Sequence, residues 1–148
     1  MADRTNAEAM DHLLECMKTH EGFMSICDMF AEDCVMTQDI MFPGKSWNGK
    51  AELEDLWREI DDGFDDINLP IYDSVRDDKC IVLFGHFEAR FTGSQYGTDG
   101  GGRPIRWQFR DAYYFEDGQL VKIDWVNDTL TVALMTGLLE KDPRPGAA

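Results

Sequence analysis

The chain has 148 residues, of which 43% are hydrophobic and 29% are charged, and this suits one globular domain with a sizeable core. Its formal net charge of -15 at pH 7 repels phosphate backbones and anionic lipid surfaces, so we expect neither nucleic acid nor a membrane as a partner. Because no apolar run approaches about 18 residues and the N-terminus lacks a signal core, we expect a single cytoplasmic domain over residues 1–148.

The cysteines and glycines carry no pattern for a bound cofactor. The four cysteines are Cys16, Cys27, Cys34 and Cys80. They form no Cys-x-x-Cys pair, have no histidine at zinc-ligand spacing, and lie in apolar runs, which predicts buried free thiols in a reducing compartment. The glycine-rich segment 93–102 lacks the Lys-Ser/Thr of a phosphate loop. We therefore expect neither a metal nor a cofactor.

The N-terminal half shows helical spacing of its apolar residues. The predicted helices are Asn6–Lys18, Glu21–Phe30 and Lys50–Phe64. Cys34–Phe42 is typical of a strand and contains Asp39, with Met41 two residues later. A charged residue in such an apolar run is either the solvated end of a strand or a carboxylate of a pocket.

The C-terminal half has the pattern of strands. The predicted strands are Asn68–Val75, Lys79–Thr92, Arg106–Phe115 and Gln119–Asn127. The last two are joined by Asp117-Gly118, a strong hairpin signal because glycine accepts a positive φ. Asp128–Leu139 follows as a helix, and residues 141–148 as a disordered tail. This order predicts an α+β fold, in which a curved antiparallel sheet wraps around N-terminal helices as a conical barrel with an internal cavity.

One face of the hairpin's first strand places a carboxylate in an aromatic row. Strand side chains alternate between faces, and this face carries Trp107, Phe109, Asp111, Tyr113 and Phe115. If the face lines a closed cavity, desolvation raises the pKa of Asp111 and prepares it to donate a proton near neutral pH. In the alternative, Asp111 lies at a wet strand edge and pairs with Arg110 or Arg106.

Two segments resemble a known family. FAEDCVMTQDIMFPGKSWNGKAEL, at 30–53, is similar to the first strand and third-helix entry of SnoaL-like polyketide cyclases and their ketosteroid isomerase relatives. RDAYYFEDGQLVKIDWVND, at 110–128, resembles the last hairpin of that superfamily, including the Asp-Gly turn and the late tryptophan. The resemblance covers roughly Met29–Leu139, and it implies the nuclear transport factor 2-like fold.

The resemblance also implies an activity and three catalytic candidates. In ketosteroid isomerases a first-strand aspartate moves a proton, and a neutral hairpin aspartate donates to an oxyanion. Asp39 and Asp111 match these positions. Aldol cyclases of the family use an aspartate just after the last tryptophan, which indicates Asp128, although Asp128 could instead cap the terminal helix.

The function that we expect is a cofactor-free cyclase that closes a ring in a polyketide-type natural-product intermediate. The ring-forming step could be an aldol condensation, ether formation by epoxide opening, or a cycloaddition. The alternatives are an epoxide hydrolase, a ketosteroid-type isomerase, or a non-catalytic module for small-molecule binding or assembly. The candidates for substrate contact are Trp57, Trp107, Phe109, Tyr113, Trp125 and Met41.

The long strands also predict an oligomer. Lys79–Thr92 and Arg106–Phe115 carry apolar residues on both faces, and only one face can pack on the helices. We therefore expect a homodimer through the outer face of the sheet.

Overall fold

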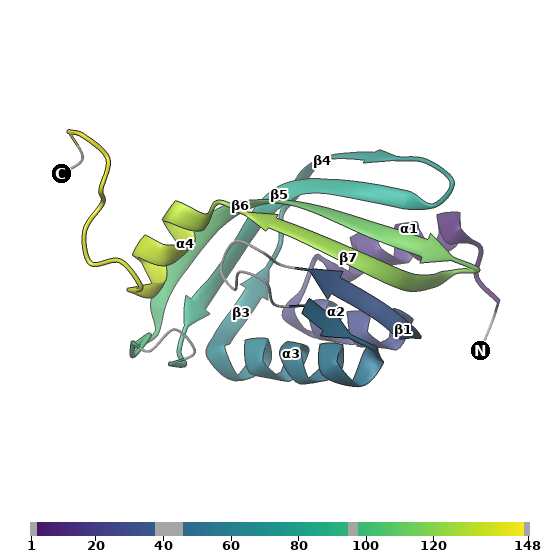
Figure 1. Ribbon diagram of the computed structural model, residues 1–148, viewed down its shortest axis with the longest axis horizontal. Coiled ribbons are helices and arrows are strands. Elements are labelled where there is room, and N and C mark those ends of the chain that lie inside the picture. Colours follow the sequence, from purple (N-terminus) through teal and green to yellow (C-terminus); the bar gives the residue numbers. More distant parts are fainter. Residues whose placement is uncertain (1–2, 38–45, 95–97, 147–148) are drawn as a thin grey trace.

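The computed structural model describes residues 3–37, 46–94 and 98–146. In these ranges, four α-helices accompany one curved, seven-stranded sheet that does not close on itself (Figure 1). The helices are α1 (Asn6–Cys16), α2 (His20–Ser25), α3 (Lys50–Gly63) and α4 (Thr129–Thr136), with a 3-10 helix at Ile26–Met29. The strands are β1 (Phe30–Thr37), β2 (Ser46–Asn48), β3 (Phe64–Asn68), β4 (Ile71–Arg76), β5 (Cys80–Phe91), β6 (Arg103–Glu116) and β7 (Gln119–Asn127). The predicted α+β class with a curved sheet is confirmed.

The sheet order is β2-β1-β7-β6-β5-β3, and β4 also pairs with β5. Every pair is antiparallel except β1 with β7, which are parallel, so the sheet is mixed rather than wholly antiparallel. A tight turn forces the antiparallel direction only on the strands that it joins, and β1 and β7 are far apart in the sequence. The predicted hairpin forms β6 and β7, with Asp117 and Gly118 both at positive φ in the turn.

Pro70 divides the predicted strand Asn68–Val75 into β3 and β4. Proline lacks an amide hydrogen and cannot donate to a sheet ladder. Its carbonyl still accepts from the backbone N–H of His86 at 3.1 Å, so both short strands stay aligned on β5. The interruption therefore bends this edge of the sheet without detaching it.

Local caps determine where the first two helices begin. Thr5 caps α1, because its side chain accepts from the Glu8 amide while its own amide donates to the Glu8 carboxylate at 2.8 Å. Thr19 caps α2 through the amide of Gly22 at 2.9 Å. The second predicted α-helix is shorter than expected, because it ends at Ser25 and continues as the 3-10 helix Ile26–Met29, after which β1 starts at Phe30.

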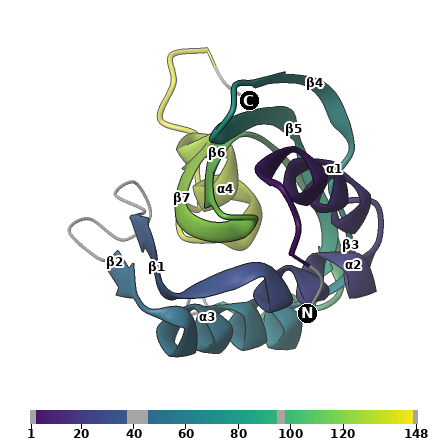
Figure 2. The same ribbon diagram turned by 90° about the vertical axis from the view of Figure 1, so that its right-hand side faces the viewer.

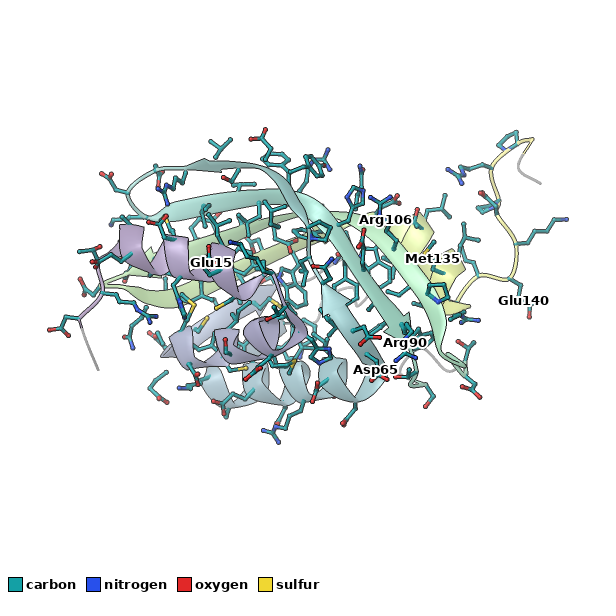
Figure 3. The ribbon with its side chains drawn as sticks, turned by 180° about the vertical axis from the view of Figure 1, so that it is seen from behind. Glu15, Asp65, Arg90, Arg106, Met135 and Glu140 are labelled. Atoms are coloured by element: carbon teal, nitrogen blue, oxygen red, sulfur yellow. The ribbon has the colours of Figure 1, made fainter. Side chains whose placement is uncertain are left out.

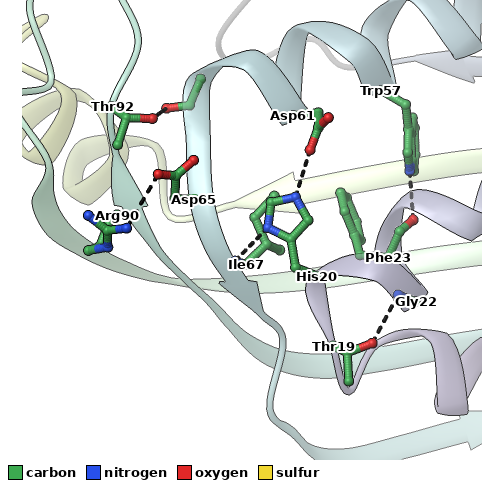
Figure 4. Close-up of polar contacts among 11 residues, drawn as sticks. Thr19, His20, Gly22, Phe23, Trp57, Asp61, Asp65, Ile67, Arg90 and Thr92 are labelled. Carbon is green, nitrogen blue, oxygen red and sulfur yellow. Dashed lines mark hydrogen bonds and ion pairs between the residues drawn. The ribbon is translucent and has the colours of Figure 1, made fainter.

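The curved strands enclose a core against the helices. In Figure 2, β5, β6 and β7 arch over the centre while α3 lies below and α1 to one side. Trp57 of α3 is fully buried and packs on Phe23 and Trp125, with ring centroids 5.4 Å and 5.1 Å away. Its indole N–H donates to the Phe23 carbonyl at 3.0 Å (Figure 4).

None of the helices in the described ranges is long and apolar enough to cross a membrane.

His20 joins three elements below this core (Figure 4). Its Nδ1 accepts from the backbone N–H of Ile67 in β3 at 3.1 Å, and its Nε2 lies 2.7 Å from Asp61 Oδ1 in α3. Since Nδ1 acts as an acceptor, the ring proton is on Nε2 and faces the carboxylate. This histidine therefore fixes α2 against α3 and β3.

Candidate active site

A small cavity of about 70 Å³ lies between the inner face of the sheet and the helices. Its lining residues are Phe23, Ile60, Phe64, Leu69, Phe87, Trp107, Phe109, Asp111, Tyr113, Trp125 and Asn127. Most of these side chains are aromatic or aliphatic, and three of them bring a carboxyl, a hydroxyl and an amide. An apolar cavity with a few convergent polar groups is the usual form of a small-molecule site.

Asp111 is the buried carboxyl group of this cavity. It is 4% exposed, and its Oδ1 accepts from the backbone N–H of Val126 at 3.1 Å. Burial raises the pKa of Asp111 well above its ordinary value, while the bonds to Val126 and Tyr113 act weakly in the opposite direction. Burial therefore favours the protonated form of this carboxyl, which can donate its proton.

Neither neighbouring arginine pairs with Asp111. The Nε of Arg106 is 2.8 Å from Glu88 Oε1, and the guanidinium of Arg110 lies 5.5 Å from the ring centre of Phe84. Both arginines are exposed, whereas Asp111 faces inward. The wet strand edge, considered above as an alternative, is therefore wrong, because alternation sends Arg106 and Arg110 to the opposite face of β6.

Tyr113 lies next to Asp111 on the same face and is fully buried. Its hydroxyl accepts from the indole N–H of Trp125 at 3.1 Å, and Trp125 stands opposite Asp111 in the ladder of β6 and β7. Burial, followed by the nearby Asp111, raises the pKa of Tyr113 well above its ordinary value. Tyr113 is therefore a neutral hydroxyl whose proton is free to point toward the carboxyl.

Asn127 is a cavity residue that the sequence analysis missed. Its Oδ1 accepts from the indole N–H of Trp107 at 3.1 Å, and its place in the ladder is opposite Phe109. The available signal was alternation, since Asn127 follows Trp125 by two residues and so shares its face of β7. A polar residue at the last inward position of the strand would have been a reasonable candidate.

The other residues that the sequence suggested for the site do not all lie at the cavity. Trp107, Phe109, Tyr113 and Trp125 line the cavity as expected. Trp57 packs behind Trp125 and, within the part of the chain that the structure describes, does not reach the cavity. Asp128 caps α4, accepting from the Thr131 amide at 3.3 Å and the Thr131 hydroxyl at 2.7 Å. Asp39 and Met41 lie outside the described residues.

All four cysteines are free thiols, as expected. Cys16 and Cys34 are buried as predicted, whereas Cys27 and Cys80 are only partly buried. Burial raises the pKa of Cys27 to about 11 and that of Cys34 to about 12. These two thiols are therefore protonated at neutral pH and are poor nucleophiles.

A second hollow, of about 590 Å³, is lined by residues of β3, β5, β6 and α4, among them Arg90, Arg106 and Met135, which are labelled in Figure 3. Both of its arginines are already paired: Arg90 with Asp65 at 3.3 Å and with Asp66 at 2.8 Å, and Arg106 with Glu88 at 2.8 Å. These pairs are largely exposed and contribute little energy, and they leave neither arginine unpaired for an anionic ligand. The inner cavity is therefore the stronger candidate site.

The fold is a curved α+β cone that encloses an aromatic cavity with one buried carboxyl group. The fold has many solved relatives of low sequence identity. AclR, a candidate hydroxylase from Streptomyces galilaeus, is 18% identical with a TM-score of 0.75, and the match covers 95% of this chain and 87% of that one. A phenazine biosynthesis-related protein from Pseudomonas aeruginosa is 12% identical with a TM-score of 0.72, and the match covers 97% and 90%.

A SnoaL-like polyketide cyclase from Agrobacterium tumefaciens is 14% identical with a TM-score of 0.65, and the match covers 87% of this chain and 95% of that one. The family model for SnoaL-like polyketide cyclases matches residues 7–134. The chain therefore belongs to the SnoaL-like polyketide cyclase family, and the resemblance found in the sequence is confirmed. No curated protein matches the chain.

Proposed function

We propose that this protein is a cofactor-free cyclase that closes a ring in a polyketide-type intermediate, with Asp111 as its acid. The observation that carries the proposal is the buried carboxyl of Asp111 at the wall of an aromatic cavity, where burial raises its pKa. A neutral acid in a dry site can protonate or hydrogen-bond an oxygen that gains negative charge in the transition state. Aldol closure and epoxide opening both develop such an oxygen.

The base of the proposed reaction is Asp39. The support comes from the sequence, in which Asp39 interrupts the apolar run that follows β1 and matches the first-strand acid of the family. One carboxylate that takes a proton and one neutral carboxyl that gives a proton would form an acid/base pair of the kind used at neutral pH. Asp128 is a weaker candidate for the base, because its carboxylate oxygens already accept hydrogen bonds from Thr131 at the N-terminus of α4.

The size of the cavity limits how the substrate could bind. About 70 Å³ is small beside the roughly 300–1,000 Å³ of typical ligand pockets. We propose that the reacting end of the substrate enters the cavity and that the rest of the chain lies across its mouth. Holding a flexible chain in a reactive fold can itself supply several kcal/mol of the barrier.

The known relatives support a biosynthetic role. The family model is named for polyketide cyclases, and the similar Pseudomonas protein is described as phenazine biosynthesis-related. Both names concern ring-containing natural products. The free thiols support the proposed cytoplasmic location, since reduced cysteines persist in a reducing compartment.

The experiment is single-turnover cyclisation of a linear poly-β-keto thioester by the parent and by variants. We expect Asp111→Asn and Asp39→Asn each to lower the rate by roughly a hundredfold or more, the usual scale for positioned proton transfer. Asp124→Asn is the matched control, because Asp124 lies on the outer face of β7 beside Lys122. A parent that does not exceed the buffer rate would rule out this reaction.

A different result would show that the shape of the cavity, rather than acid/base chemistry, accelerates the reaction. If both Asn variants stay within several-fold of the parent while Trp107→Ala abolishes turnover, the acid/base proposal is wrong. Substrate folding would then provide the rate, as in a cycloaddition. Trp107 is suited to this comparison because it forms part of the cavity wall and stacks on Phe87 with ring centroids 4.9 Å apart.

We also propose that the protein is a homodimer through the outer face of the sheet. Val126 is 50% exposed there, and Val82, Phe84 and Tyr114 are only partly buried. Arg110 covers the Phe84 ring at 5.5 Å, which shields part of this face in the monomer. The apolar patch that remains is the support for a second copy.

A further inference from the structure

The orientation of the Asn127 amide is determined by Trp107. An indole N–H can only donate, so the atom of Asn127 that lies 3.1 Å from Trp107 Nε1 must be the amide oxygen. The two hydrogens on Nδ2 consequently point away from Trp107. No acceptor within residues 3–37, 46–94 and 98–146 takes these hydrogens, although Asn127 lines the cavity.

The Asp111 carboxyl reaches toward the same part of β7. Its Oδ1 accepts from the backbone N–H of Val126, the residue directly before Asn127. In the ladder, Asp111 is opposite Trp125 and Phe109 is opposite Asn127, so Asp111 and Asn127 are diagonal neighbours on the inner face. Diagonal neighbours are roughly 7–8 Å apart along the sheet, a gap that one small acceptor group between two donors can bridge.

We infer that Asn127 is a second hydrogen-bond donor of the cavity, positioned by Trp107, and that the ligand enters with a carbonyl or enolate oxygen that accepts from both Asn127 Nδ2 and the Asp111 carboxyl. Trp107 is a positioning residue, because it acts through Asn127. This inference adds to the proposed function by naming the end of the substrate that enters the cavity. It rests on the proposed function only for the role of Asp111 as a donor.

The remaining polar groups of the cavity are consistent with an acceptor rather than a donor on the ligand. The Trp107 and Trp125 indoles are donors that already have protein partners, and the Tyr113 hydroxyl uses its oxygen to accept from Trp125. An ammonium group, which can only donate, would therefore meet chiefly donor groups in the cavity. A ketone, thioester or enolate oxygen would meet two donors and the apolar wall that its carbon chain requires.

The probes are 4-nitrophenol, studied as its phenolate, and 4-nitrotoluene. The second has nearly the same shape but carries a methyl group in place of the phenolate oxygen. We expect the parent to bind the phenolate more tightly than the toluene. Asn127→Leu should weaken phenolate binding by about tenfold or more, the usual scale for a hydrogen bond to a charged oxygen, and should change toluene binding by less than twofold. Gln108→Leu is the matched control, because it removes an exposed amide from the outer face of β6.

Trp107→Phe tests the positioning role. The variant keeps an aromatic ring but removes the indole N–H, so the amide of Asn127 is free to turn. We expect it to lower the preference for phenolate over toluene, and we expect the double variant with Asn127→Leu to be no worse than Asn127→Leu alone. Such non-additivity is the sign of two residues acting as one unit.

Two results would overturn the inference. One is an Asn127→Leu variant whose phenolate Kd stays within twofold of the parent. The other is an equal loss of both probes, which would make Asn127 a packing residue. The acid role of Asp111 in the proposed function is tested separately by turnover: if Asp111→Asn cyclises as fast as the parent while Asn127→Leu still binds phenolate more weakly, that acid role is wrong and the donor site stands.

Discussion

The indole N–H of Trp125 donates to the hydroxyl of Tyr113 at 3.1 Å, across the ladder between β7 and β6. This bond occupies the oxygen of Tyr113 as an acceptor and leaves its proton available to Asp111, with which Tyr113 also interacts. The three side chains thus form a chain of donors that ends at the buried acid. Hydrogen bonds in such a chain polarise one another, so each member affects how readily Asp111 gives up its proton.

Tyr113→Phe should interrupt this chain. The change removes the acceptor for the Trp125 indole and one hydrogen bond to Asp111, so the pKa of Asp111 should rise further. We expect the free energy of unfolding to fall by about 1–3 kcal/mol, the cost of an unmet buried donor. Chemical denaturation measures the loss. Tyr114→Phe, on the outward side of the same strand, is the control and should be near neutral.

Asp111 should make stability depend on pH in a direction opposite to most carboxylates. Its pKa is raised in the folded state, so between the ordinary aspartate pKa and the raised value the folded state binds more protons than the unfolded state. The protonated Asp111 therefore contributes to the free energy of unfolding at low pH. This contribution is lost as the pH rises through the window, at up to about 1.4 kcal/mol per pH unit.

Asp111→Asn tests this pH dependence, because the amide keeps the shape and an acceptor for Val126 but cannot ionise. We expect the variant to gain stability relative to the parent as pH rises from about 4, since desolvation no longer penalises a charge. Urea unfolding of both proteins across the pH series gives the difference. A constant difference at every pH would contradict a neutral buried Asp111.

Asp128 can be assigned to capping or to catalysis by two substitutions. Asp128→Asn keeps a side-chain oxygen for the Thr131 amide, whereas Asp128→Ala removes it. If Asp128 only caps α4, the alanine variant should lose about 1 kcal/mol of stability and the asparagine variant should cyclise at the parental rate. A drop in turnover for Asp128→Asn with unchanged stability would instead make Asp128 part of the reaction.

The proposed dimer should depend on the outer face of the sheet. Val126→Glu places a charge where a second copy would bury Val126, so we expect a monomer by sedimentation velocity at micromolar concentration. Leu139→Glu is the control, because Leu139 is 41% exposed and follows α4 rather than lying in the sheet. A parent that already sediments as a monomer would contradict the proposed dimer.

Most of the local elements, and the faces of the strands, could be predicted from the residue pattern alone. Asp117-Gly118 fixed the hairpin because its turn needs positive φ, and alternation correctly put Trp107, Asp111 and Tyr113 on one face. The helical spacing in α3 likewise predicted its buried stripe. These features depend on residues close together in the chain, so the local pattern is sufficient to predict them.

Which face of β6 is buried, and which side chains meet across strands, depends on the tertiary packing. Alternation left Asp111 either in a cavity or at a wet edge, and the choice was made by the helices that cover the inner face. The bond between Trp107 and Asn127 joins residues 20 positions apart, and the parallel pairing of β1 with β7 spans most of the chain. Such contacts depend on packing between distant segments, for which a single sequence carries no periodic signal.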